Sequence, residues 1–200
     1  MKRVEFLFDF GSPNAYLAHK VIPDIEKRTG AKFEYVPVLL GGIFKLTNNK
    51  PPMIAFGEVK GKLAYEQRET ERFIRRHGIK QYKFNPHFPV NTLALMRMAV
   101  AAQEKGVLMP FVEAAFHHMW ERPKKMDDPA VIRAALLESG LDADGLIAAA
   151  QTPDVKQRLM SNTEEAVSHG VFGSPSFLVG GELFFGKDRL RDVEDEIAGR

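Results

Sequence analysis

Residues 6–20, "FLFDFGSPNAYLAHK", decide the fold, because an apolar run meets a helical stretch there at a single Gly-Ser-Pro turn. Ahead of the turn, apolar side chains recur at every second position, which is the period of a β-strand: Val4, Phe6, Phe8 and Phe10. Leu7 on the opposite face indicates that both faces of this strand are covered. The stretch therefore predicts a central strand that leads directly into a helix.

The chain after the turn predicts a β-α-β unit. A helix is expected over about residues 14–28, with Gly30 as its stop and a kink or an early end at Pro23. The second strand lies within "AKFEYVPVLLGG" (31–42), where Pro37 places a strand end or a sheet edge nearby.

The middle of the chain predicts helices without strands. Residues 42–62 are rich in Asn, Pro and Gly, and we expect them to form a long irregular loop. The pairs Asp128-Pro129 and Thr152-Pro153 each place a capping side chain before a proline at the first helical position. Helical patterns continue to Gly170 and predict helices over residues 63–76, 91–105, 110–121, 129–139, 143–151 and 153–169.

The end of the chain completes a mixed fold. The stretch "GSPSFLVGGELFFG" (173–186) predicts two short strands joined at Gly180-Gly181, and a closing helix follows. Without the helical middle, the order of elements is β-α-β-α-β-β-α, which is the thioredoxin order. We therefore predict an α/β protein with a thioredoxin-like fold and a large all-helical insertion. Residues 1–46 plus 153–200 would form the thioredoxin-like domain, and residues 47–152 the insertion.

Composition excludes several classes of function. The net charge of +2 and the lack of a long basic block disfavour a nucleic-acid partner. The chain has no cysteine, which excludes disulfides, cysteine-based zinc sites and thiol chemistry of its own. His117 and His118 are adjacent and lack the spacing of a zinc pair, so no metal is expected. No apolar run is long enough to span a membrane, and the start resembles a strand more than a signal peptide, so we expect a cytoplasmic protein.

Two Ser-Pro pairs are candidates for a functional site. Ser12-Pro13 is either a helix cap or a seat for the sulfur of a ligand. Ser174-Pro175 either begins a strand or forms a cis peptide that turns the backbone N–H and C=O of Ser174 toward a peptide-like ligand. The thioredoxin order brings both pairs to one end of the sheet, where we expect them to face each other across a small cleft.

Two longer motifs around these pairs carry a family resemblance. "FDFGSPNAYL" (8–17) and "GVFGSPSFLVGGELFFGKDRL" (170–190) resemble 2-hydroxychromene-2-carboxylate isomerases and the related kappa-class glutathione transferases, a branch of the DsbA-like thioredoxin superfamily. "NNKPP" (48–52), "VKGK" (59–62) and "HFPVNTLALMR" (87–97) agree with the same family, so the resemblance covers the whole chain. It implies a helical insertion of the DsbA or kappa type, glutathione as cofactor and a homodimer.

The resemblance also implies where the missing thiol comes from. Redox members of the superfamily open the first helix with Cys-x-x-Cys, where this chain has Ser12-Pro13-Asn14-Ala15. A helix N-terminus lowers the pKa of a thiol, and a serine hydroxyl can donate a hydrogen bond to a thiolate. The site keeps these groups but has no thiol, and the resemblance implies that glutathione supplies it.

Family roles can be carried onto matching positions. Ser12 would hydrogen-bond the glutathione sulfur, and the Ser174 backbone, held by Pro175, would pair with the cysteinyl unit. Asp188 would take the γ-glutamyl ammonium, although it could equally be a plain N-cap for residues 189–197.

Three further positions are carried over from the family. Asn49 and Lys187 could contact glutathione. Lys60 could bind a carboxylate or simply be a solvated loop lysine. Five side chains could line the pocket of an aromatic substrate, although core packing explains the phenylalanines equally: Phe44, Tyr65, Tyr82, Phe84 and His87.

Three functions stay open from the sequence. The first is a glutathione-dependent isomerase acting on an aromatic-derived conjugated carboxylate such as 2-hydroxychromene-2-carboxylate. The second is a kappa-like glutathione transferase, which needs only an apolar electrophile. The third is a thioredoxin-like binding or chaperone module, which predicts no affinity for glutathione and no effect of Ser12→Ala.

Overall fold

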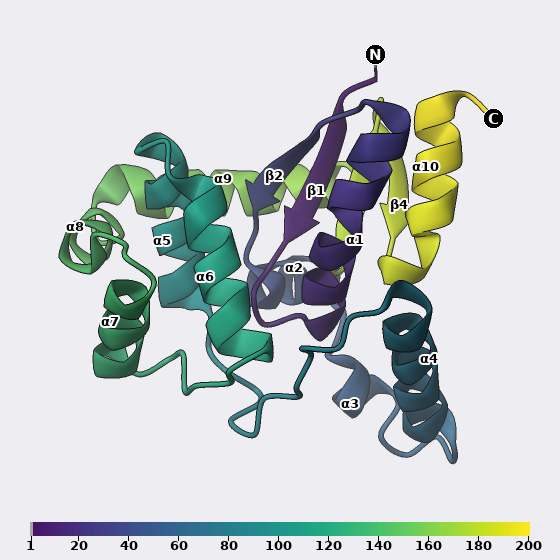
Figure 1. The fold of residues 1–200 in the computed structure, drawn as a ribbon, viewed down its shortest axis with the longest axis horizontal. Helices are drawn as coiled ribbons and strands as arrows, with labels where there is room; N and C mark the ends of the chain where they lie inside the picture. Colours follow the sequence, from purple (N-terminus) through teal and green to yellow (C-terminus); the bar gives the residue numbers. More distant parts are fainter. Residues whose placement is uncertain (1) are drawn as a thin grey trace.

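The computed structural model describes residues 2–200 and shows one four-stranded sheet built from both ends of the chain (Figure 1). Strand β1 (Val4–Phe8) lies inside the sheet, parallel to β2 (Phe33–Pro37) and antiparallel to β3 (Ser176–Val179). Strand β4 (Glu182–Phe185) pairs antiparallel with β3, which gives the order β2-β1-β3-β4. The thioredoxin-like order expected from the sequence is confirmed.

Alternation along β1 divides the core into two parts. Phe6 stands opposite Tyr35 and Phe177 in the two neighbouring strands, and its ring centroid lies 4.9 Å and 5.4 Å from theirs. Leu7 points to the other face and packs in a second buried cluster that includes Leu178. Both faces of β1 are therefore covered, as its apolar pattern predicts.

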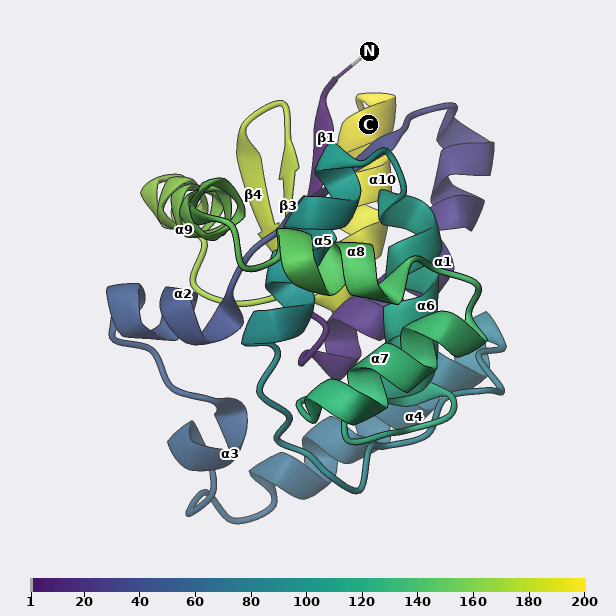
Figure 2. The ribbon, with the colours of Figure 1, turned by 90° about the vertical axis from the view of Figure 1, so that its left-hand side faces the viewer.

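Helices cover the two faces of the sheet (Figure 2). Helix α9 (Pro153–Ser168) lies on one side, and helices α1 (Pro13–Thr29) and α10 (Leu190–Ala198) lie on the other. Helix α1 continues past Pro23 to Thr29, so the expected early end at this proline is wrong. Buried residues on either side, Ile22 and Ile25, hold the helix in place despite the hydrogen bond that proline removes.

The remaining helices fill the middle of the chain and form the predicted insertion, with these bounds: α4 (Lys62–His77), α5 (Leu93–Glu104), α6 (Leu108–Trp120), α7 (Pro129–Glu138) and α8 (Ala143–Ala149). Trp120 is fully buried and its Nε1 donates to the Phe10 carbonyl at 2.9 Å. This bond ties α6 to the turn between β1 and α1. The division into residues 1–46 plus 153–200 and 47–152 stays a prediction.

Residues 42–62 differ from the expected irregular loop. Helix α2 (Leu40–Thr47) and the short helix α3 (Pro52–Ala55) occupy much of this stretch. The N-terminus of α2 is fixed from outside, because the Leu40 N–H donates to Oδ2 of Asp9 at 2.8 Å. A bond to a residue so distant in the sequence leaves no local signal, which explains why the loop prediction was wrong.

Local signals elsewhere are confirmed. The side chains of Asp128 and Thr152 accept backbone hydrogen bonds at the starts of α7 and α9. Gly180 and Gly181 connect β3 to β4 with φ angles of 60° and 94°, which glycine adopts without a steric penalty. Pro37 ends β2 at an edge of the sheet. Within residues 2–200, no helix combines the length and the apolar character needed to cross a bilayer.

Candidate functional site

The two Ser-Pro pairs meet at the end of β1. The Ser12 hydroxyl donates to the Ser174 carbonyl at 2.8 Å, and the Asp9 N–H donates to the Ser174 hydroxyl at 3.1 Å. Both serines are buried, with 5% and 8% of their surface exposed. The prediction that these pairs lie together is confirmed, but no cleft separates them because they are directly hydrogen-bonded.

Ser12 is the N-cap of α1. Its hydroxyl accepts from the Ala15 N–H at 3.2 Å, and Pro13 takes the first helical position. The cap interpretation is therefore confirmed. The Asn14 N–H has no hydrogen-bond partner within residues 2–200, so one donor at the positive end of α1 stays available.

The Ser174-Pro175 peptide is cis and precedes β3. The Pro175 carbonyl accepts from the Gly186 N–H at 2.9 Å, which links this turn to the end of β4. The Ser174 N–H has no partner among the described residues 2–200. The backbone at the site thus offers a second available donor beside the first.

Asp9 is a site residue that the sequence analysis did not identify. Its side chain is only 1% exposed, and three donors surround its two oxygens. Oδ1 accepts from the Gly11 N–H at 2.8 Å and from the Thr92 hydroxyl at 2.6 Å, and Oδ2 accepts from the Leu40 N–H at 2.8 Å. An acidic residue inside an apolar run was the available signal, since carboxylates are seldom fully buried without partners.

The environment of Asp9 acts on its pKa in opposite directions. Burial raises the pKa because it disfavours the charged form, and this is the largest cause. The hydrogen bonds from Thr92, Leu40 and Gly11 lower it. This carboxyl therefore holds the β1–α1 turn, the start of α2 and the residue before α5 in one arrangement beside Ser12.

Asn49 lies close to the two serines through the chain around Phe172. Its Nδ2 donates to the Phe172 carbonyl at 2.8 Å, two residues before Ser174, and its Oδ1 accepts from the Lys50 N–H at 2.8 Å. Lys60 is exposed on the turn before α4 and makes no ion pair within residues 2–200. The structure therefore associates Asn49 with the site and leaves Lys60 outside these contacts.

Lys187 and Asp188 form an ion pair just after β4. The Lys187 ammonium is buried, with 3% of its side chain exposed, and lies 3.0 Å and 2.9 Å from the two Asp188 oxygens. It also lies 5.2 Å from the centre of the Phe73 ring, a distance suited to a cation–π contact. Asp188 belongs to a short 3₁₀ turn, η1 (Lys187–Arg189), and makes no capping bond, so the alternative of a plain N-cap is wrong.

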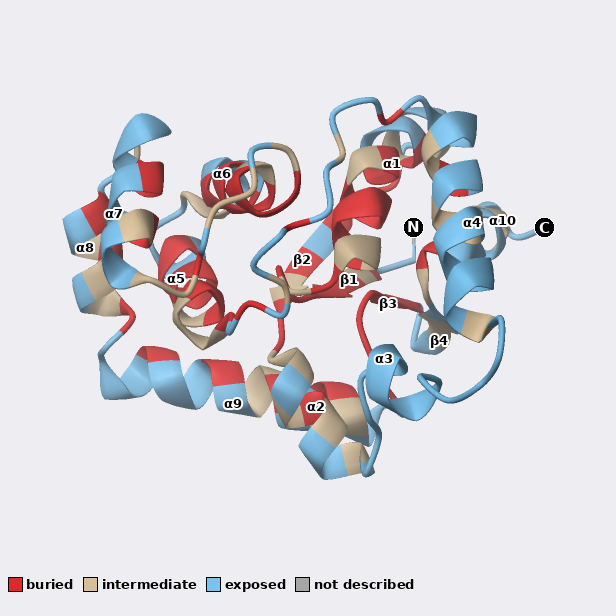
Figure 3. Cartoon of the chain, turned by 90° about the horizontal axis from the view of Figure 1, so that it is seen from below, coloured by how far each residue is buried: buried red, intermediate tan, exposed pale blue. Residues whose placement is uncertain are grey.

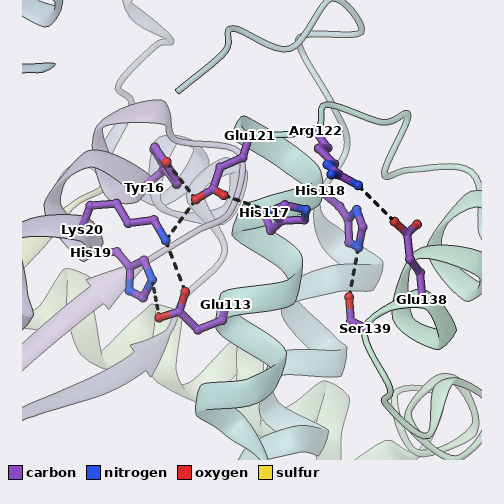
Figure 4. A network of polar contacts seen from close by, with 10 residues as sticks. All are labelled: Tyr16, His19, Lys20, Glu113, His117, His118, Glu121, Arg122, Glu138 and Ser139. Carbon is purple, nitrogen blue, oxygen red and sulfur yellow. Dashed lines mark hydrogen bonds and ion pairs between the residues drawn. The ribbon is translucent and has the colours of Figure 1, made fainter. Parts of the chain in front are cut away.

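A network of charged side chains joins α1 to α6 on another side of the molecule (Figure 4). Lys20 of α1 lies 3.3 Å from Glu113 on α6 and 3.0 Å from Glu121, the residue that follows α6. Glu121 also accepts from the Tyr16 hydroxyl at 3.0 Å. Nε2 of His19 is 3.1 Å from Oε1 of Glu113, within ion-pair distance but without hydrogen-bond alignment.

This network lowers the pKa of Glu113 from its ordinary value of 4.5 to about 2, chiefly through His19 and then through Lys20. A lowered pKa means that Glu113 stabilises the fold above about pH 4.5 and loses that contribution as the pH falls toward 2. We expect Glu113→Gln to reduce the free energy of unfolding at neutral pH by about 1 kcal/mol, because solvent screens a side chain that is 55% exposed.

Denaturant unfolding across this pH range tests the Glu113 prediction. The deficit of Glu113→Gln should disappear in acid, whereas Glu104→Gln on α5 should match the wild type at every pH. A deficit that stays constant from neutral pH to acid would contradict the assignment.

The other titratable candidates have structural partners. His117 lies 2.9 Å from Glu121, and His118 lies 3.0 Å from the Ser139 hydroxyl. Burial is the main cause that lowers the pKa of His118. No group of three or more His, Asp or Glu side chains in the described part of the chain is placed to hold a metal ion.

Comparison with known proteins shows which family the chain resembles. The sequence-family model described as DSBA-like thioredoxin domain matches residues 3–198. The chain is 29% identical to 2-hydroxychromene-2-carboxylate isomerase of Sphingobium xenophagum, over 98% of each protein. It is 27% identical to human glutathione S-transferase kappa 1, over 94% of this chain and 88% of that protein.

Solved structures show the same fold. A solved structure of 2-hydroxychromene-2-carboxylate isomerase superposes with a TM-score of 0.83 at 22% identity, covering 98% of this chain and 94% of that one. A probable DsbA oxidoreductase from Streptomyces coelicolor superposes with a TM-score of 0.73 at 15% identity, covering 100% and 91%. Because the family model matches residues 3–198, the chain belongs to the DsbA-like thioredoxin family.

Proposed function

We propose that this protein is a glutathione-dependent isomerase of an aromatic-derived conjugated carboxylate, of the 2-hydroxychromene-2-carboxylate type. The observation that carries the proposal is the junction of Ser12 and Ser174, which keeps a serine hydroxyl and available backbone N–H groups at a helix N-terminus in a chain without cysteine. The relatives that bear the isomerase and transferase names support the same class.

The groups at this junction fit a thiol-bearing peptide. The N–H groups of Asn14 and Ser174 have no partner within residues 2–200, so each can donate to a ligand without losing an existing bond. A thiolate at the start of α1 would face the positive end of the helix, which favours the charged form of the sulfur.

Ser12 has one hydroxyl proton, which it donates to the Ser174 carbonyl in the structure. To donate to a thiolate, the hydroxyl would turn away from that carbonyl. The carbonyl would then accept a hydrogen bond from the cysteinyl N–H of glutathione, as it would from the backbone of a neighbouring strand. This exchange replaces each bond that it breaks, so ligand binding leaves no buried group unpaired.

The remaining residues would hold the ends of glutathione. Asp188 is 61% exposed and would take the γ-glutamyl ammonium, sharing its charge with Lys187. Asn49 would contact the peptide beside Phe172, and Lys60 would reach a carboxylate from the turn before α4.

Bound glutathione would supply a thiolate that adds to a conjugated substrate and leaves again, so that the substrate is isomerised and the thiol is recovered. In the alternative, a kappa-like transferase, the sulfur stays attached to an apolar electrophile. Ser12 would stabilise the thiolate in either case, so the product distinguishes the two functions.

The resemblance also supports a homodimer. Figure 3 shows α3 as an exposed element, and four apolar side chains on and after it are exposed: Met53 at 58%, Ile54 at 68%, Phe56 at 41% and Val59 at 52%. A second copy of the chain packed on this surface would bury them. Light scattering tests this, and the mass of a single chain would contradict it.

The test of the proposed function is binding followed by product analysis. Calorimetry should show that wild-type protein binds reduced glutathione. The complex should then convert 2-hydroxychromene-2-carboxylate to an isomer without consuming glutathione. A stable glutathione adduct instead would favour the transferase, and absence of glutathione binding would contradict both enzymes and favour a binding module.

A further inference from the structure

A cavity of about 540 Å³ lies among α2, α5 and α9, apart from the two serines. Helix α9 packs against both α2 and α5, and Figure 2 shows α2 and α9 at the left of the molecule with α5 beside them. The volume falls within the range of about 300–1,000 Å³ that is usual for small-molecule sites. Most of its surface is apolar, and the lining includes Leu39, Leu46, Leu93, Leu159 and Met160.

The charged side chains around this cavity are mainly basic. Lys45, Arg97 and Lys156 come from α2, α5 and α9, and Glu164 is the only acidic residue in the lining. None of these four forms an ion pair within residues 2–200. An apolar floor with available cations favours a ligand with an apolar body and a negative charge.

The cavity is separate from the two serines but lies next to residues that donate hydrogen bonds to Asp9. The lining includes neither Ser12 nor Ser174, nor any of the five aromatic side chains considered for a substrate pocket. Leu39 and Leu93, however, each neighbour a residue that donates a hydrogen bond to Asp9. Asp9 and its hydrogen bonds therefore connect the cavity to the serine site.

We propose that this cavity is a second ligand site, which binds a small aromatic or conjugated carboxylate. The rings of the ligand lie on Leu93, Leu159 and Met160, and its carboxylate faces Arg97. Arg97 is partly buried, and its planar guanidinium matches both oxygens of a carboxylate. Lys45 and Lys156 add positive charge from the two flanking helices. The proposal does not depend on glutathione binding.

The probe is 2-naphthoate, titrated into the full chain without glutathione and followed by calorimetry and by the methyl resonances of labelled methionines. Binding should shift the Met160 signal. Arg97→Gln should weaken binding by about tenfold or more, because a hydrogen bond to a charged group is lost. Arg158→Gln removes the same charge from α9 outside the cavity lining and should bind as the wild type does.

Two further measurements test the proposal without the Arg97 variant, in case that variant does not fold. Lys156→Gln at the exposed rim should weaken 2-naphthoate by about threefold, in keeping with a screened charge. The uncharged 2-naphthamide should bind the wild type more weakly than 2-naphthoate. Three results would overturn the proposal: an unmoved Met160 signal, equal affinities in the Lys156 and Arg158 variants, or displacement of 2-naphthoate by glutathione.

Discussion

Asp9→Ala is expected to lower the free energy of unfolding by about 3 kcal/mol or more. The buried carboxylate accepts from the Thr92 hydroxyl, which is also buried, and from the part-buried N–H groups of Gly11 and Leu40. A buried donor left without a partner costs about 1–3 kcal/mol, the two part-buried donors add to this cost, and removal of the buried charge offsets only part of the sum.

Chemical denaturation of Asp9→Ala and Asp9→Asn measures this effect. Asparagine keeps an oxygen for the donors at Oδ1, but its amide nitrogen faces the Leu40 N–H, so we expect a smaller loss than for alanine. Thr92→Val removes only one of the three donors and should cost the least. Stability of Asp9→Ala within about 0.5 kcal/mol of the wild type would contradict the role given to this carboxyl.

Ser12→Ala is expected to raise the pKa of bound glutathione by about one to two units and to weaken its binding. A hydrogen bond to a charged group contributes about 1.5–3 kcal/mol, and one pKa unit corresponds to about 1.4 kcal/mol. The variant also loses the cap on Ala15, so a general loss of stability of about 1 kcal/mol is expected in addition.

The matched control for Ser12→Ala is Thr152→Ala. Thr152 caps α9 in the same way, with a proline at the next position, but it does not touch the serine junction. This variant should lose similar stability and keep the wild-type affinity for glutathione. Equal weakening of glutathione binding by both variants would show that Ser12 acts only as a cap.

Much of the fold could be predicted because its signals are local. The helix expected over residues 129–139 is observed at Pro129–Glu138, since a capping aspartate and a proline mark its start and a stop glycine directly follows it. The hairpin at Gly180-Gly181 follows from the left-handed conformation that glycine permits. Such signals do not depend on the rest of the chain.

Errors arose where distant residues decide the structure. Helix α2 starts where Asp9 accepts its first N–H, and α1 passes Pro23 because flanking residues are packed. Contacts between distant residues also limited how much of the site could be predicted from the sequence. The meeting of Ser12 and Ser174 follows from the order of elements, but the direct bond between them and the pairing of Asp188 with Lys187 depend on side-chain positions that no motif records.

The pKa of glutathione bound to the wild-type protein shows directly whether the junction of the two serines stabilises a thiolate. Ultraviolet absorbance of the thiolate, followed across pH in the presence of saturating protein, gives this value. We predict a pKa at least about one unit below that of free glutathione, because the start of α1 and the Ser12 hydroxyl favour the thiolate. An unchanged or raised pKa would contradict it, since the junction of the two serines would then not stabilise a thiolate.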